Sequence, residues 1–374
     1  MNIYIKEAKT KPDLKTFIYL PEKLHAGHEE WTHPIYRDEW EYFDRNRNKA
    51  FSYCDTILYL AFRDGRCVGR IMGIINRRFN EHKGEALARF GFLEAAEDRE
   101  VVRALLAAVE DWGRGMGMTR IVGPYGFSDQ DPEGFMIEGF EQRGTIATYA
   151  NFPWMPGFVE AEGYVKDMDY VVYKIDVPKV MPEFYNRIYE RAMRKGVFEV
   201  LDFRNKKELK PWVRPILALM NECYLEGNIY GFAPLDEKEM DDLAGRYMPI
   251  LDPRFIKVVK KGDEVAAFII GIPDMSEGIR KARGRLFPFG FIHILRSAKK
   301  TKQLDLLLGA IKEKYRGQGL DVMMGVRMLK SAQAAGLEII DTHHEMETNV
   351  KVRGEMERMG GTIYKRFRVF SKNL

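Results

Sequence analysis

The chain of 374 residues is 45% hydrophobic and 30% charged, an ordinary balance for a globular protein that excludes extensive disorder. At roughly 150 residues per domain, its length predicts two domains. The formal net charge of +4, from 59 basic and 55 acidic residues, is too small to indicate a nucleic-acid-binding protein.

The three cysteines are widely spaced, at Cys54, Cys67 and Cys223, and none forms a C-x-x-C pair. This spacing favours reduced thiols over a structural zinc site or a disulfide framework. The N-terminal segment lacks the apolar core of a signal peptide, and no segment approaches the roughly 20 apolar residues that a spanning helix needs. We therefore expect a cytoplasmic protein without membrane insertion.

A turn followed by a half-buried strand is predicted by DGRCVGRIMGII and again by KGDEVAAFIIGI. In these segments Gly65 aligns with Gly262, at an offset of 197 positions. The ends of the two halves match at the same offset, because Gly163 of EAEGYVKDMDYVVYKI aligns with Gly360 of ERMGGTIYKRFRVF. Two separate segments that share one offset indicate an internal duplication.

A helix that ends in glycine and leads into a strand also occurs twice, in ALLAAVEDWGRGMGMTRIVG and in MMGVRMLKSAQAAGLEII. The aligned glycines, Gly117 and Gly336, are 219 positions apart. The segment WGRGMGM is glycine-rich, but its place at a helix end favours C-capping over ligand binding. The larger offset predicts an insertion in the second half, at about residues 274–302.

The boundary between the halves is predicted near residue 176, where a strand is followed by the Pro-punctuated start of a helix. The chain then divides into residues 1–176 and residues 177–374. Each half alternates strands with helices, which predicts an α/β fold of α+β layers, with helices flanking a mixed central sheet in each half.

A short glycine loop, EKYRGQGL, joins an apolar strand to an amphipathic helix in the second half. Gly317 and Gly319 lack Cβ atoms, so backbone N–H groups can converge there, and the helix start adds a positive dipole end. Such a nest suits a pyrophosphate. The loop has neither the G-K-[ST] end of a P-loop nor the dinucleotide-binding fingerprint.

This loop resembles the Gcn5-related N-acetyltransferase (GNAT) family, whose [RQ]-x-x-G-x-[GA] signature lies between its fourth strand and third helix. Arg316 to Gly319 match the signature, whereas Asp321 stands where the family has Gly or Ala. The resemblance implies two GNAT-like domains, with acetyl-CoA or another acyl-CoA as the donor substrate. The donor-binding residues that it implies are Ile311, Arg316, Gly317, Gln318, Gly319, Leu320, Asp321 and Asn349.

The resemblance extends downstream of the loop and into the first half. Asn349 lies where the family has an Asn that contacts the pantetheine arm, and Met356 replaces the Tyr that protonates the leaving thiolate in many members. Asn151 parallels Asn349 in the first half, but the loop there, AAEDREVV, has no glycine and three acidic residues. We expect residues 1–176 to form a degenerate partner domain that shapes the acceptor cleft.

Acyl transfer to an amine needs backbone N–H groups for the oxyanion and a base for the proton. The resemblance places the oxyanion donor near residues 309–311, and THHEMETN supplies base candidates. Strand alternation predicts His343, Glu345 and Glu347 on one face, with His344 on the other, so a shared metal is not expected. We predict Glu345 or His343 as the base, with Glu347 as a third candidate. The alternative, that these are solvated residues at a strand end, stays open.

Two further segments each have a functional and a structural interpretation. The basic residues around LFPFGFIHIL could gather an anionic acceptor, a tRNA or a membrane surface, or could form a solvated rim. The aromatic residues within 28–48 could line an acceptor cleft or pack over the first sheet.

The hypothesis we favour is an acyl-CoA-dependent N-acyltransferase that acts on a small-molecule or peptide amine, with no metal. The alternatives are a Fem-like transferase that uses aminoacyl-tRNA, the one nucleic-acid partner considered, and a non-catalytic module that binds CoA or another ligand.

Overall fold

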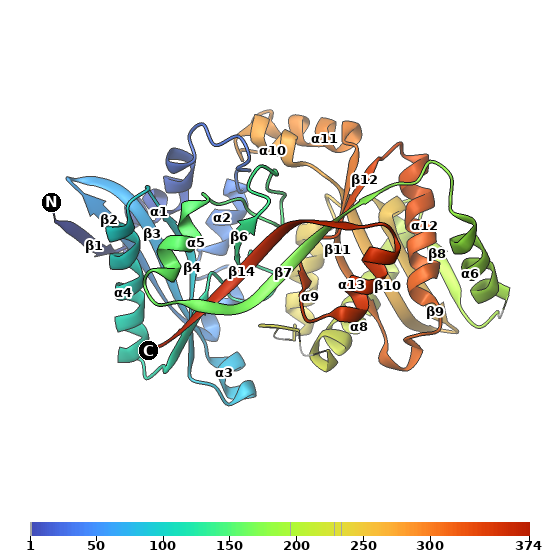
Figure 1. Ribbon diagram of the computed structural model, residues 1–374, viewed down its shortest axis with the longest axis horizontal. Coiled ribbons are helices and arrows are strands. Elements are labelled where there is room, and N and C mark those ends of the chain that lie inside the picture. Colours follow the sequence, from blue (N-terminus) through green and yellow to red (C-terminus); the bar gives the residue numbers. More distant parts are fainter. Residues whose placement is uncertain (1, 195, 228, 233) are drawn as a thin grey trace.

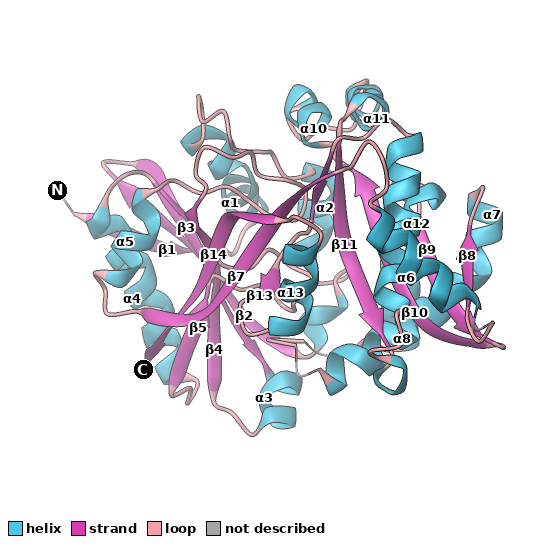
Figure 2. Ribbon diagram, turned by 45° about the vertical axis from the view of Figure 1, so that its right-hand side comes forward, coloured by secondary structure: helices cyan, strands magenta, loops and turns pink. Residues whose placement is uncertain are grey.

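The structure, a computed structural model, describes residues 2–194, 196–227, 229–232 and 234–374. Within these residues the strands form one 14-stranded sheet, and helices pack on it (Figures 1 and 2). The strand order is β1-β2-β3-β4-β5-β14-β7-β12-β11-β10-β9-β8, with β13 paired to β7 and β6 paired to β14.

The elements fall into two series along the chain. The first series is β1 (Ile3–Glu7), α1 (Lys11–Leu24), α2 (Tyr36–Tyr42), β2 (Cys54–Arg63), β3 (Arg66–Asn76), α3 (Arg77–Lys83), β4 (Leu87–Ala95), α4 (Arg99–Gly115), β5 (Arg120–Gly123), β6 (Phe135–Glu138), α5 (Trp154–Glu160) and β7 (Val165–Asp176). The second series is α6 (Glu183–Arg194), β8 (Glu199–Asp202), α7 (Lys206–Leu209), α8 (Val213–Glu226), α9 (Glu237–Tyr247), β9 (Ile256–Lys261), β10 (Glu264–Pro273), α10 (Ser276–Ala282), α11 (Gly290–Lys300), β11 (Gln303–Ile311), α12 (Leu320–Ala334), β12 (Ile339–Asp341), β13 (Glu345–Met346), α13 (Val350–Arg358) and β14 (Thr362–Asn373).

The duplication inferred from the sequence is confirmed by the backbone. Each aligned glycine pair occupies matching places, after β2 and β9, after α4 and α12, and before β7 and β14. All six glycines have positive φ, a conformation that residues with a Cβ rarely adopt. The φ values are +74° and +60° for Gly65 and Gly262, +79° and +70° for Gly117 and Gly336, and +87° and +81° for Gly163 and Gly360.

The two halves exchange their last strands. β7 ends the first half but pairs with β12 of the second, with Asp176 opposite Ile339. β14 ends the second half but pairs with β5 of the first, with Phe370 opposite Gly123. β7 and β14 also pair with each other, and they run through the middle of the molecule (Figure 1). The proposed boundary near residue 176 divides the sequence, whereas each half of the sheet contains the other half's last strand.

Helices cover both faces of each half of the sheet, as strand alternation requires. In the second half, Val258 packs in the apolar cluster of α8, and its neighbour Val259 packs in that of α12. In the first half, α4 packs against Ile71 and α1 packs against Met72. The predicted layers of helices on a mixed sheet are confirmed.

The insertion at about residues 274–302 forms the helices α10 and α11 between β10 and β11. It contacts the first half directly, because the backbone N–H of Tyr36 donates to the carbonyl of Gly284 at 3.0 Å. Arg285 pairs with Glu22 at 2.8 Å on the same side. The insertion therefore bridges the two halves.

Among the described residues, no helix combines the length and the apolar character that crossing a bilayer requires.

Candidate active site

The glycine loop connects β11 to α12 and exposes the start of that helix. Gly317 has φ of +73°, and Gly319, the N-cap of α12, has φ of +87°. A Cβ at Gly317 would meet open space, whereas one at Gly319 would lie 3.5 Å from Cβ of Ala192 on α6. The backbone turns as an anion nest requires, and the 15-residue helix behind it adds a positive dipole end.

The side chains of the loop brace it from within. Nε of Arg316 donates to the carbonyl of Ile311 at 3.2 Å, and Nε2 of Gln318 donates to the carbonyl of Lys314 at 2.9 Å. Leu320 is buried in the core beneath α12. These residues therefore shape the loop, and the backbone presents the binding groups.

The strands beside the loop diverge. β11 pairs with β12 only over residues 303–305, and β12 ends at Asp341. The chain then turns away, and β13 pairs with β7, so that Glu345 lies opposite Val171. β11 continues to Ile311, with a bulge near Leu307. Beyond Asp305, β11 therefore has no strand partner on the side of β12 and β13 among the described residues, and this stretch leads to the glycine loop.

Glu345 carries a carboxyl group on β13, near the diverging end of β11. Burial, with a smaller contribution from the Glu355 carboxylate, raises the pKa of Glu345 to about 8. Burial also raises the pKa of Glu355 to about 7, with a further contribution from Asp321 in the first turn of α12. A carboxylate with a pKa near neutrality can accept and release a proton at physiological pH.

Tyr224, on α8, connects this carboxyl group with β11. Burial raises the pKa of its phenol, the carboxylates of Asp129 and Glu345 add to that rise, and a hydrogen bond from the Gly309 backbone opposes it. The phenol therefore keeps its proton and lies beside the backbone segment predicted to hold the oxyanion. No sequence motif pointed to Tyr224, because α8 lies far from the loop in the chain.

His343 and Glu347 lie elsewhere. The predicted continuous strand over residues 342–347 is wrong, because β12 ends at Asp341 and His343 has φ of +60°. The N–H of His343 donates to Oδ1 of Asp341 at 2.7 Å, and burial lowers the pKa of the imidazole to about 4. Glu347 forms an ion pair with Lys166 at 2.5 Å. Of the three base candidates, Glu345 alone lies near Tyr224.

A buried polar cluster, formed by Tyr125, Asp129, Glu133, Tyr170 and His344, lies between the halves. Burial raises the pKa of Asp129 to about 7 and that of Glu133 well above its usual range. The ring of His344 stacks on Tyr170 at 5.2 Å between centroids, and its Nδ1 lies 4.0 Å from Oε1 of Glu133.

Two atoms of the buried polar cluster, Asp129 Oδ1 and His344 Nε2, have no hydrogen-bond partner among the described residues. The phenol of Tyr170 interacts with the carboxyl group of Glu133. Buried polar atoms are costly when unpaired, so such a group needs water or a bound polar molecule. The acidic residues of SDQDPEGF, just after β5, are the part of this cluster that is contiguous in the sequence, and they do not by themselves indicate its other members.

In the first half, the N-terminus of the corresponding helix, α4, is capped by a side chain of the protein itself. The Asp98 side chain accepts from the N–H groups of Glu100 at 3.1 Å and Val101 at 3.4 Å. Arg63 pairs with Asp98 at 2.9 Å and with Glu100 at 2.8 Å. The protein's own carboxylate therefore occupies the N-terminus of α4, where a phosphate would bind.

The two parallel asparagines hold backbone groups. Oδ1 of Asn349 accepts from the N–H of Val352 at 3.5 Å as the cap of α13, and Oδ1 of Asn151 accepts from the N–H of Met136 at 2.6 Å. Met356 packs in the apolar cluster beside α12. A thiolate near α13 would therefore find no proton donor at position 356.

The aromatic residues within 28–48 largely pack over the first sheet. Tyr36 and Phe43 are buried in one cluster with α1, and Trp40 and Tyr42 pack against it. Trp31 is also buried, and it lines a cavity of about 80 Å³ between β4 and the segment after β5. The packing interpretation holds for most of this segment.

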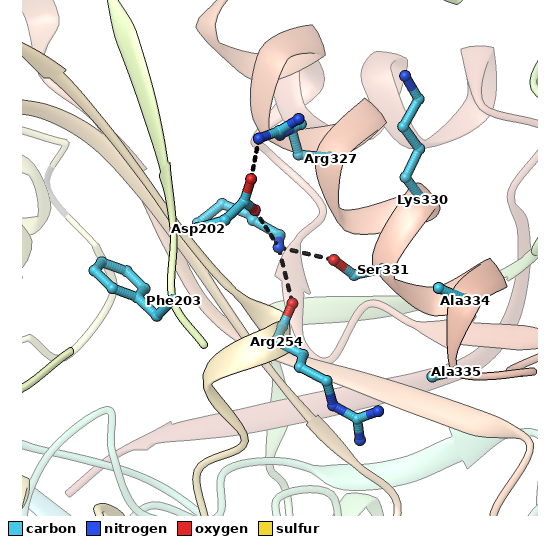
Figure 3. A pocket seen from close by; sticks show the side chains of 9 residues that line it. Asp202, Phe203, Arg254, Arg327, Lys330, Ser331, Ala334 and Ala335 are labelled. Atoms are coloured by element: carbon cyan, nitrogen blue, oxygen red, sulfur yellow. Dashed lines mark hydrogen bonds and ion pairs between the residues drawn. The ribbon is translucent and has the colours of Figure 1, made fainter. Parts of the chain in front are cut away.

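A second pocket, of about 290 Å³, lies over the C-terminal half of α12 (Figure 3). At its base Nζ of Lys257 donates to Oδ1 of Asp202 at 2.6 Å, to the carbonyl of Arg254 at 2.8 Å and to Oγ of Ser331 at 2.8 Å. Arg327 also pairs with Asp202. These bonds use all three N–H donors of the Lys257 ammonium group and join α12 to β8 and β9. We therefore interpret the polar residues of this pocket as structural contacts between these elements.

No group of three or more His, Cys, Asp or Glu side chains in the described parts of the chain is placed to hold a metal ion.

Comparison with known proteins agrees with this geometry. Residues 19–151 match the model of the acetyltransferase (GNAT) family. A tandem GNAT protein from the clavulanic acid biosynthesis pathway superimposes with a TM-score of 0.55 at 11% identity, over 100% of this chain and 98% of that one. The chain therefore contains a region of the GNAT family in its first half, and over its whole length it has a tandem GNAT fold. It has the tandem arrangement, and the family match lies in the half without the glycine loop.

Two other proteins extend the comparison. A GCN5-related N-acetyltransferase from Sphaerobacter thermophilus has a TM-score of 0.53 at 12% identity, over 99% of this chain and 95% of that one. A protein named bacterial ceramide synthase, from Caulobacter vibrioides, is 28% identical over 373 residues, which cover 98% of this chain and 96% of that one. Together with the GNAT family match, these similarities indicate an acyltransferase.

Proposed function

We propose that this GNAT protein is an acyl-CoA-dependent N-acyltransferase that attaches a fatty acyl group to the amine of a long-chain amino alcohol. The observation that carries the transfer chemistry is that Tyr224 lies near both the Glu345 carboxyl group and the Gly309 backbone of β11, where β11 diverges from β12. The acceptor class follows from the 28% identity, along nearly the whole chain, to a protein named bacterial ceramide synthase. A ceramide is an N-acylated long-chain amino alcohol.

The donor is assigned to the glycine loop. The backbone of Gly317 and Gly319 and the start of α12 bind the pyrophosphate of the acyl-CoA. The thioester lies along the diverging end of β11, where N–H groups near Gly309 stabilise the oxyanion. Asp321 and Glu355 place negative charge near the same helix start, which weakens the binding of the phosphates.

The reaction needs two proton transfers. The carboxylate of Glu345 takes the proton that the amine loses as the nitrogen–carbon bond forms. The phenol of Tyr224 protonates the sulfur as the carbon–sulfur bond breaks, a role that Met356 cannot fill. The pKa of about 8 for Glu345 leaves a fraction of the carboxylate ionised at neutral pH, and this fraction grows as the pH rises.

The buried polar cluster is the proposed site for the polar end of the acceptor. Asp129, Glu133 and His344 provide hydrogen-bonding atoms for the hydroxyl groups of the acceptor, while its amine lies at Glu345. The carboxylate of Asp129 contributes to the raised pKa of Tyr224, so this cluster lies within electrostatic reach of the proposed proton donor.

The test is an assay of the purified protein with palmitoyl-CoA or acetyl-CoA and the amino alcohol sphinganine. Released CoA thiol is measured by a colorimetric reagent, and the amide product by mass spectrometry. Sphinganine with a blocked amine is the matched acceptor control, and Glu345→Gln is the matched protein control. We expect thiol release and amide formation only with the free amine and the unaltered protein.

Other outcomes separate the alternatives. Thiol release without amide would mean hydrolysis, and would refute the assigned acceptor. Binding of acyl-CoA without turnover on any amine would favour the non-catalytic module. The absence of acyl-CoA binding would refute the donor site and leave the transferase that uses aminoacyl-tRNA to be tested.

A further inference from the structure

The insertion carries a cluster of exposed apolar side chains. Phe287 is 73% exposed, Phe289 68%, Leu295 53% and Phe291 43%. The rings of Phe287 and Phe291 lie 6.4 Å apart, and Phe291 and Leu295 are four residues apart on α11, so they project from one side of the helix. We call these four residues the aromatic tip.

The aromatic tip stands on a firmly packed base. Ile279 of α10 and Ile294 of α11 are buried in one cluster. The two helices approach so closely that a Cβ at Gly278 would lie 2.6 Å from Cα of Ile294. The loop between them is equally tight, because a Cβ at Gly290 would lie 1.6 Å from the carbonyl oxygen of Arg285. The insertion therefore has a core of its own, and the aromatic tip is apolar surface that this core does not use.

Positive charge surrounds the aromatic tip. Residues 276–302 contain eight Lys or Arg residues and a single acidic residue, in a chain whose total net charge is only +4. Arg283 and Arg285 are partnered by Glu22. Arg296, Lys299 and Lys300 follow Leu295 on α11, and they have no ion-pair partner among the residues that the structure describes.

We propose that the insertion is a docking surface for an anionic membrane, with the aromatic tip in the interfacial region and the basic residues of α11 over the lipid head groups. Exposed aromatic and aliphatic side chains with a cationic rim suit a lipid surface, where rings settle at head-group depth. A nucleic acid could place its phosphates on the cations and stack its bases on the aromatic rings. It would leave the aliphatic side chain of Leu295 without a partner.

Docking through the insertion would also position the protein for a lipid substrate. Gly284, at the base of the insertion, packs against Pro34, which lines the cavity of about 80 Å³ between β4 and the segment after β5. This consequence, that a long-chain substrate enters from the membrane, rests on the proposed function. The docking itself does not, because it is measured without turnover.

The test is co-flotation of the full chain with vesicles of phosphatidylcholine alone or with added phosphatidylglycerol, at low and high salt. The variant combines Phe287→Ser, Phe289→Ser and Phe291→Ser, and the matched control is Tyr4→Ser, an aromatic residue on β1 that is 62% exposed. We expect binding to the anionic vesicles, weakened by salt. The variant should bind at least tenfold less, and the control should bind normally.

The single variants Phe287→Ser and Phe289→Ser carry the test if the combined variant fails to fold by circular dichroism. Three results would overturn the proposal: no flotation with anionic vesicles, equal flotation of the Phe variants and the unaltered protein, or an equal loss in Tyr4→Ser. Light scattering on the same samples identifies a protein partner, because a dimer that the Phe variants dissociate, without vesicle binding, would make the surface an interface between two copies.

Discussion

Replacing Glu345 with Gln tests whether the buried carboxyl group is kept for chemistry at the expense of stability. Burial raises its pKa from 4.5 to about 8, so between these values the native carboxyl group keeps a proton that the unfolded chain loses. A raised pKa of an acid lowers stability as the pH rises above 4.5, and each pH unit costs about 1.4 kcal/mol. The penalty is under about 1 kcal/mol at pH 5 and about 3 kcal/mol at pH 7.

Glutamine keeps the shape of the side chain and removes this penalty. Glu345→Gln should therefore raise the free energy of unfolding by about 3 kcal/mol at pH 7, and by under about 1 kcal/mol at pH 5. The same variant should lose about a hundredfold or more in kcat, because the base is gone. Urea unfolding by circular dichroism at both pH values, beside the thiol-release assay, measures both effects.

Two results would refute this reasoning. A stability change that is equal at pH 5 and pH 7 would mean that the carboxyl group is not protonated in the native state. A stabilised variant with unchanged kcat would support the raised pKa of Glu345 but would exclude Glu345 as the catalytic base.

Three further changes probe other parts of the structure. Gly319→Trp should weaken acyl-CoA binding at least tenfold by calorimetry, because it adds bulk beside Ala192 and strains a residue with φ of +87°, whereas Gly336→Trp, at the other end of α12 in open space, should bind normally. Tyr224→Phe should lower kcat by about ten- to a hundredfold with little change in KM, and an unchanged kcat would exclude the phenol as proton donor. Lys257→Met should destabilise the fold by about 2–3 kcal/mol in thermal unfolding, because it removes three hydrogen bonds of a buried ammonium group and leaves Asp202 with Arg327 alone, while activity per folded molecule stays the same.

The turns, the internal repeat and the glycine loop could be predicted from the sequence, because each depends on a short contiguous segment. Glycines such as Gly65 and Gly262 indicate turns because their backbone has positive φ, and the repeat followed from their spacing. The loop at Gly317 and Gly319 was found because its glycines, strand and helix are contiguous.

Features that depend on distant contacts could not be predicted. The alternation of apolar and polar residues along β7 and β14 fits either half of the sheet equally. The exchange of strands therefore has no signal in the local sequence. The reversal at His343 depends on the contact with Asp341, and the buried polar cluster joins loops and strands more than 150 residues apart, as Asp129 and His344 show.

The exchanged strands make the two halves mutually dependent for folding. Residues 177–374 produced alone would leave the edge of β12 without β7, and residues 1–176 produced alone would leave the edge of β5 without β14. Each fragment would then expose an unpaired strand edge, which is a template for aggregation. Produced together, the fragments should reassemble into one particle by complementation, because each carries the strand that the other lacks.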